Sequence, residues 1–116
     1  MPHYLNNCKN RDHARIYGAD AFYDLDTSGR QAEKQFSFRP GDWCVVASEP
    51  IPGHIRFAWY KFTSSRLAAD ETQQQVRVLC GTFEKEETVP RGEAPSHKYY
   101  RPFFNKNGDF KQQSVI

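Results

Sequence analysis

The chain has few cysteines, and none of them lie close together in the sequence. Cys8, Cys44 and Cys80 are far apart in the 116 residues. An odd number of cysteines without CxxC spacing argues against a disulfide framework. Cys44 and Cys80 stand within apolar runs, which is typical of small buried side chains. We therefore expect free thiols, a reducing environment and a cytoplasmic protein.

Long apolar runs and an excess of one charge are missing as well. No run approaches the roughly 20 residues that a membrane-spanning helix needs. The N-terminal MPHYLNNCKN lacks the apolar centre of a signal peptide. The 16 basic side chains are nearly balanced by 14 acidic ones, which leaves a net charge of +2. We expect a soluble protein without membrane contact, in which any phosphate binding depends on local basic patches.

Catalytic and metal-binding motifs are also absent. The chain contains no nucleophile elbow, HExxH, P-loop or dinucleotide-binding motif. His3, Cys8 and His13 lack the tight pairs that structural zinc sites usually show. The three aspartates within Asp20–Asp26 are more typical of loops and helix caps than of a cation site. We predict no metal, no cofactor and no catalytic residue, and enzyme activity is the least favoured class of function.

Aromatic residues are abundant, at 15% of the chain, and both tryptophans fall in two neighbouring stretches. These are Phe36–Glu49 and His54–Thr63, and the first contains the turn sequence Arg39-Pro40-Gly41-Asp42. The nearly continuous apolar run after this turn predicts a strand buried on both faces. In the second stretch both alternating sets carry aromatics, which predicts a central strand. We expect Trp43 and Phe57 to be core residues.

A third strand is predicted over Gln75–Phe83, where apolar and polar residues alternate. Gly81 within it indicates a bulge or a close approach of another backbone segment. The charged run Glu84–Glu87 is typical of a solvated strand end. Between the second and third strands, Arg66–Glu71 is a candidate short helix after a cap at Ser64 or Ser65.

Beyond these strands, Asn107-Gly108 predicts the tip of a two-residue hairpin. We predict one domain over residues 1–116, with an irregular segment 1–35 and a loop or hairpin at 90–116. The fold class is mainly β (α+β): a small mixed, mostly antiparallel β-barrel with one or two short helices.

The order of these strands and turns resembles the PUA-like superfamily, which includes the ASCH and EVE domains. The residues that carry the resemblance are an aromatic strand, the Arg39–Asp42 turn, an apolar strand, a Pro/Gly turn and a long aromatic strand, over about residues 36–89. The resemblance implies a barrel that binds nucleic acid and reads a modified or flipped base.

Aromatic and basic side chains occur together along the chain, above all in His97–Lys111. Aromatic rings can stack on bases, and Lys and Arg can contact phosphates. We expect four residues to stack on the ligand: Trp59, Tyr60, Tyr99 and Tyr100. We expect five residues to bind phosphate: Arg39, Arg56, Lys61, Lys98 and Arg101. Adjacent tyrosines on an extended chain point in opposite directions, so at least one of Tyr99 and Tyr100 should be exposed.

The sequence thus favours a nucleic-acid-binding module, with DNA or RNA as the partner. Two alternatives stay open. One is a protein- or peptide-interaction module that uses an exposed strand edge or an aromatic groove. The other is a small enzyme that acts on a nucleotide-like substrate and would need a pocket with paired titratable groups. Against all three stands the simpler interpretation that the tryptophans are core residues and the charges are solvated.

Overall fold

A single five-stranded sheet organises the chain, in the order β1-β3-β4-β5-β2. The computed structural model describes residues 2–7, 9–27 and 37–116. The strands are β1 (His3–Asn6), β2 (Ala21–Asp26), β3 (Trp43–Ile51), β4 (His54–Ala69) and β5 (Gln75–Pro90). The helical elements are short: α1 (His13–Tyr17) and two 3-10 turns, η2 (Ala94–Ser96) and η3 (Arg101–Phe103). The predicted mainly-β class is confirmed, because strands dominate these elements. The sheet is mixed and mostly antiparallel: β1 pairs parallel to β3, and the other strand pairs that the structure describes are antiparallel.

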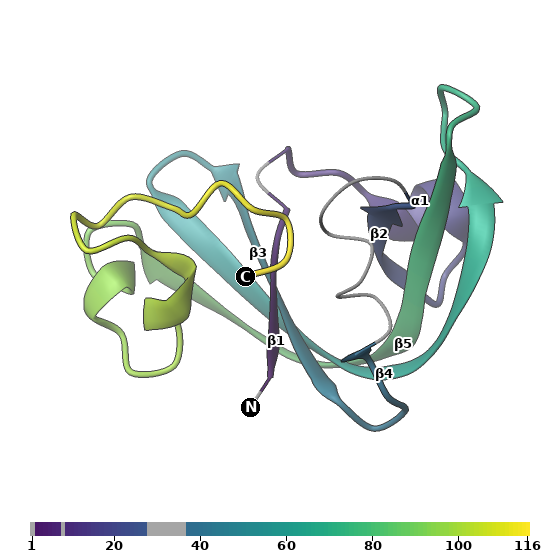
Figure 1. Cartoon of the computed structure of the whole chain (residues 1–116). Coiled ribbons are helices and arrows are strands. Elements are labelled where there is room, and N and C mark those ends of the chain that lie inside the picture. Colours follow the sequence, from purple (N-terminus) through teal and green to yellow (C-terminus); the bar gives the residue numbers. More distant parts are fainter. Residues whose placement is uncertain (1, 8, 28–36) are drawn as a thin grey trace.

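The long antiparallel ribbon of β4 and β5 connects the two ends of the molecule. It runs from the C-terminal segment (residues 91–116) at one end to α1 and β2 at the other, and it bends between them (Figure 1). The register shifts near the bend, between Phe62 and Ser64. Gly81 lies opposite this point, where a Cβ atom would come within 2.1 Å of the Lys61 carbonyl oxygen. The predicted close backbone approach at Gly81 is therefore confirmed.

Two predictions along this ribbon are wrong. The helix predicted at Arg66–Glu71 is absent, because Ser64–Ala69 is the second half of β4, paired with Gln75–Cys80. The pairing supplies backbone partners that override the helical preference of the Leu-Ala-Ala sequence. The charged run Glu84–Glu87 does not end the third strand either, because β5 continues to Pro90 and pairs this run with β4.

β3 is buried on both faces, as its continuous apolar run predicts. Cys44 and Val46 pack on one face with Leu5 and Phe62. On the other face, β3 contributes to a cluster with Phe57 and several residues of the C-terminal segment. Phe57 is fully buried, which confirms its prediction, and its strand β4 is the central one.

Trp43 is not a core residue, and this prediction is wrong. It is 39% exposed, because it stands at the first position of β3. Val45 and Ala47 point to the same face and pack against the cluster that the C-terminal segment completes. Trp43 therefore belongs to the open end of an otherwise covered face.

The sheet does not close into the predicted barrel, because the edge strands β1 and β2 do not pair. A side chain bridges them instead: the Tyr23 hydroxyl donates to the Asn6 carbonyl oxygen at 2.7 Å. The N-terminal segment is also more regular than predicted, since it contains β1, α1 and β2. Residues 28–36, which include the end of the predicted irregular segment, lie outside the described residues.

The C-terminal hairpin turns differently from the two-residue prediction. The Gly108 amide donates to the Asn105 carbonyl at 3.0 Å, and the Asn105 amide donates to the Asp109 carbonyl at 2.7 Å. Of the predicted tip, only Gly108 has a positive φ, at 89°. This is a three-residue loop that ends on a left-handed glycine.

Cys44 and Cys80 are buried and free, as expected, and Cys8 lies outside the described residues.

Candidate functional site

The uncovered end of the sheet carries an aromatic groove of about 620 Å³ between the turn before β3, the sheet and the C-terminal segment. Trp43 and Trp59 line it, and the register of three strands sets a lysine beside the groove next to each: Trp43 of β3 lies opposite Lys61 of β4, and Trp59 of β4 lies opposite Lys85 of β5. The two indole rings are 6.2 Å apart and nearly perpendicular. Tyr99 is a further wall residue and is 53% exposed.

Each of these three rings has a lysine ammonium beside it. The Nζ atom of Lys61 is 5.2 Å from the Trp43 ring centre, and that of Lys85 is 4.8 Å from Trp59. The Nζ atom of Lys98 is 5.5 Å from Tyr99. All three lysines are exposed, and none forms an ion pair with an acidic side chain that the structure describes. Ring faces and uncompensated cations are therefore presented together.

A partly buried hydrogen-bond chain holds Trp59 from beneath. Its indole Nε1 donates to the Tyr100 hydroxyl at 3.1 Å, and this hydroxyl donates to Glu87 at 2.7 Å. The Tyr100 ring lies flat on Phe57, with centroids 3.7 Å apart. Burial, together with the neighbouring Glu87 carboxylate, raises the pKa of Tyr100 to about 12. Tyr100 is thus the buried member of the tyrosine pair and orients Trp59, so its predicted role as a ligand-stacking residue is wrong.

The acidic residue in the groove is already engaged. The Asp42 carboxylate lies 2.9 Å from the His3 Nε2 atom and also accepts from the Arg39 amide. The hydrogen bond from His3 lowers the pKa of Asp42. The Asp42 carboxylate therefore contacts His3 and the backbone of the turn rather than the three lysines.

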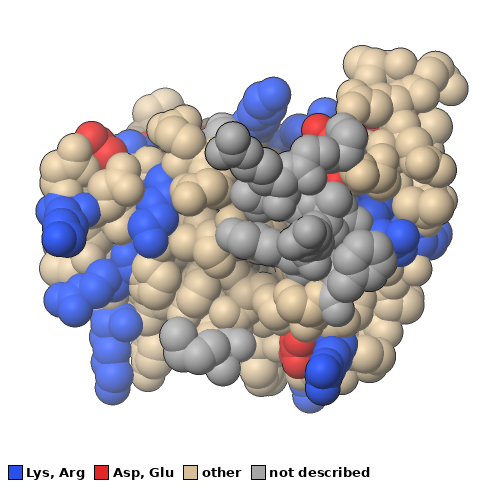
Figure 2. Space-filling view, in the orientation of Figure 1, with Lys and Arg blue, Asp and Glu red and all other residues tan. Residues whose placement is uncertain are grey.

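A second groove, of about 580 Å³, adjoins the first along the C-terminal segment. Arg101, Lys106 and Lys111 line this basic groove, and Pro102 lines both grooves. Lys and Arg side chains gather on the side of the molecule that carries this segment, where Asp and Glu are sparse (Figure 2). The basic groove offers cations without an exposed ring, because Phe104 on its wall is buried.

The other predicted site residues lie elsewhere. Tyr60 follows Trp59 on β4 and so points to the opposite face, where its ring stacks on Phe22 at 4.7 Å. Arg56 is paired with Glu86, so its charge is compensated. Arg39 is exposed in the turn.

The structure brings together four of the predicted residues: Trp59, Tyr99, Lys61 and Lys98. It adds two that sequence reasoning missed. The apolar run places Trp43 in the core, and the charged run places Lys85 at a solvated strand end. The sequence signal for Lys85 is the alternation of side chains along a strand, which places Lys85 and Glu87 on the same face. That Lys85 lies opposite Trp59 depends on the pairing of β4 with β5.

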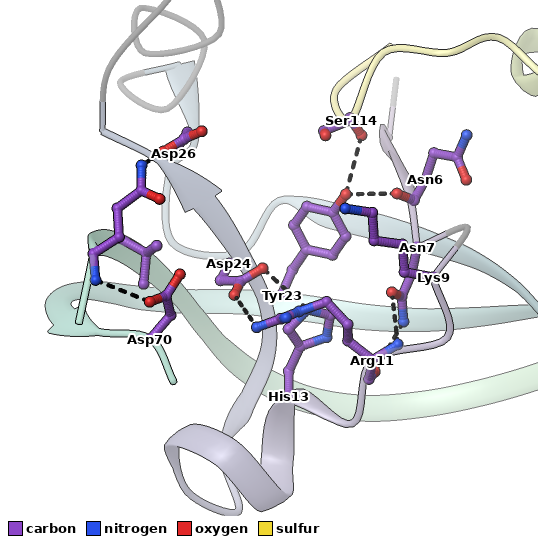
Figure 3. A pocket seen from close by; sticks show the side chains of 12 residues that line it. Asn6, Asn7, Lys9, Arg11, His13, Tyr23, Asp24, Asp26, Asp70 and Ser114 are labelled. Carbon is purple, nitrogen blue, oxygen red and sulfur yellow. Dashed lines mark hydrogen bonds and ion pairs between the residues drawn. The ribbon is translucent and has the colours of Figure 1, made fainter. Parts of the chain in front are cut away.

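A third pocket lies at the open seam between β1 and β2, and Asp24 at its wall is held by hydrogen bonds from neighbouring side chains (Figure 3). Asp24 of β2 accepts from the Tyr17 hydroxyl at 2.5 Å, from Arg11 at 3.0 Å and from His13 at 3.1 Å. Burial would raise the pKa of Asp24, but hydrogen bonds from His13 and Tyr17 and the charge of Arg11 outweigh it and lower the pKa to about 2. Asp24 is therefore an ionised structural acceptor and a poor general base near neutral pH.

Asp24 with Arg11, His13 and Tyr17 forms the set of paired titratable groups that an enzyme interpretation requires. The Asp24 carboxylate, however, already accepts three hydrogen bonds from the other members. His13 is 5% exposed, and its ring points at Asp24. Within residues 2–7, 9–27 and 37–116, no group of three or more His, Cys, Asp or Glu could hold a metal ion. The arrangement stabilises the seam.

Among the helices that the structure describes, none has the length and apolar character needed to span a bilayer.

No protein-family model, no curated protein and no solved structure matches the chain. The resemblance to the PUA-like superfamily therefore remains a prediction from the order of strands and turns, and function has to be inferred from the side chains of the grooves.

Proposed function

We propose that this protein binds nucleic acid through the aromatic groove, with a base on its rings and phosphates on its lysines. The observation that carries the proposal is the pairing of three groove rings with three uncompensated ammonium groups, at 4.8 to 5.5 Å. Every base has a π-face, and stacking on an aromatic side chain contributes about 1–3 kcal/mol per base. Lysines around the rings would meet the backbone of the same nucleotide.

The lysines beside the rings do not prevent stacking. A cation–π contact at an exposed site contributes only about 0.5–1 kcal/mol, which is less than the stacking of a base. A base that enters therefore displaces the ammonium group, and the flexible lysine stem keeps the charge beside the incoming phosphates. Trp59 needs no reorganisation for this, because Tyr100 already fixes its indole.

The groove suits an unstacked base. A base within a duplex has to be extruded at a cost of a few kcal/mol, which a mismatched, modified or single-stranded base avoids in part. Reading of a modified or flipped base, membership of the PUA-like superfamily and a cytoplasmic location complete the proposal, and they rest on the sequence arguments. A peptide-interaction module is the alternative that the same rings allow.

Binding can be tested with fluorescein-labelled single-stranded and hairpin DNA and RNA at low salt, with anisotropy and tryptophan quenching as readouts. We expect binding with quenching of Trp43 and Trp59, and an affinity that falls steeply with salt. Absence of binding to all of these probes, with and without base modifications, would overturn the proposal and favour the peptide alternative.

A further inference from the structure

We infer that the aromatic groove and the basic groove form one continuous track for a single strand of several nucleotides, with bases held in the first and phosphates in the second. This inference rests on the proposed function and deepens it, because it names the class of ligand and says which groove holds its bases and which holds its phosphates. The two grooves are distinct cavities, yet they meet at Pro102, which lines both.

The chain between the grooves alternates between surface and core. Tyr99 is exposed and Tyr100 is buried, Arg101 is exposed, and Phe103 is fully buried. The Tyr100 and Phe103 rings both pack on Phe57, at 3.7 and 5.5 Å. Two buried anchors and a proline therefore fix the ridge between the grooves, so the spacing from Tyr99 to Arg101 is set before a ligand arrives.

The two grooves divide the chemistry of a nucleotide chain. The aromatic groove exposes the rings of Trp43 and Tyr99, whereas the basic groove has no exposed ring. Arg101, Lys106 and Lys111 line the basic groove, and none of its lining residues that the structure describes is acidic, which leaves a positive balance. Cations without stacking surfaces suit the phosphate backbone, which continues from a base held next to Pro102.

A duplex would not use both grooves in this way. Its bases are stacked on one another, so the rings of the aromatic groove would gain no base face unless one were extruded. A flexible single strand can place a base on Trp43 or Tyr99 and still turn its backbone over the ridge. We therefore expect a single strand to bind more tightly than a duplex of the same sequence.

The test is a length series of oligothymidylates, from about two to about twelve nucleotides, which spans the site sizes of single-strand grooves. Affinity is expected to rise with length beyond the dinucleotide and then to level off. The double variant Lys106→Ala/Lys111→Ala should lower the salt slope for the long oligomer by about 1.4, since each phosphate that is no longer neutralised accounts for about 0.7. The same variant should leave dinucleotide binding unchanged.

Two further variants make the outcomes distinguishable. Trp43→Ala should weaken the dinucleotide and the long oligomer alike, by about fivefold or more. Arg15→Ala removes an exposed charge from α1, away from both grooves, and should change neither. If oligomers bind but affinity does not depend on length, or if the double lysine variant affects short and long oligomers equally, the track is refuted while the aromatic groove stands. If no oligomer binds, the track and the proposed function fail together.

Discussion

The aromatic groove and the seam pocket contrast in what happens to their charges. In the seam pocket Asp24 meets three donors, from Arg11, His13 and Tyr17. In the aromatic groove each of the three lysines lies beside a ring face instead of an opposite charge that the structure describes. A charge that is compensated within the protein stabilises the fold, whereas a charge left uncompensated on a preformed surface is available to a ligand. We therefore place the proposed ligand site in the aromatic groove rather than in the pocket with more titratable groups.

The largest effect on this comparison is expected when Asp24 is replaced. Asp24→Ala leaves His13 and Tyr17 without their acceptor, whereas Arg11 keeps Glu71, and loss of one partner of a buried ion pair costs about 3 kcal/mol. We expect a lower free energy of unfolding in a urea titration, while the fraction that remains folded binds nucleic acid normally. Glu84→Ala, which removes an exposed carboxylate, is the matched control. Unchanged stability of Asp24→Ala would show that the cluster is not structural.

Acid should have the next largest effect, through the Asp24 carboxyl of the seam. The pKa of Asp24 is lowered from 3.8 to about 2 in the folded protein, so the group contributes stability above the unfolded value and loses it as pH falls toward the folded one. A difference of that size corresponds to about 2 kcal/mol. Thermal melts from about pH 5 down to about pH 2 should show a steeper decline for the parent than for Asp24→Asn. Parallel declines would contradict the assignment.

On the groove side, Trp43→Ala should separate binding from stability. Trp43 is 39% exposed, so we expect little change in the unfolding free energy. Binding of a single-stranded oligomer should weaken by about 1–3 kcal/mol, with an unchanged salt slope, because stacking releases no counterions. Phe57→Ala is the opposite case, since its ring is fully buried and its loss should cost about 3–5 kcal/mol of stability. A strongly destabilised Trp43→Ala would return this residue to the core.

The smallest effects are expected from single lysines. Lys61→Ala and Lys98→Ala should each flatten the salt dependence of binding by about 0.7, with no measurable change in melting temperature. Arg56→Ala serves as the comparison, because Glu86 already compensates its charge. A salt slope that changes equally in all three variants would mean that charge in general, rather than the groove, determines binding.

Much of the central sheet was predictable, because it depends on local signals. The Arg39–Asp42 turn has a proline followed by a glycine at positive φ, and it closes with the Asp42 amide on the Arg39 carbonyl at 2.9 Å. The apolar run of β3 and the two-sided aromatics of β4 identified a buried strand and a central strand. A large part of the candidate site followed from the same reasoning, namely Trp59, Tyr99, Lys61 and Lys98.

The rest depended on neighbours that the sequence does not name. Sequence order can tell that Tyr99 and Tyr100 point in opposite directions, but only the packing against Phe57 decides which one is buried. Likewise Trp43 and Val45 point to the same face, and the extent of the C-terminal segment decides that only one is covered.

The sequence by itself determined the class of the fold, several of its turns and its supply of aromatic and basic side chains, because these follow from periodicity and backbone geometry within a few residues. Tertiary structure alone decided that the sheet stays open, that Ser64–Ala69 is a strand, and that Lys85 meets Trp59. Strand pairing joins residues far apart in the chain, and the register it selects is set by all the packed faces together. The aromatic groove therefore depends on strand pairing and register rather than on local sequence.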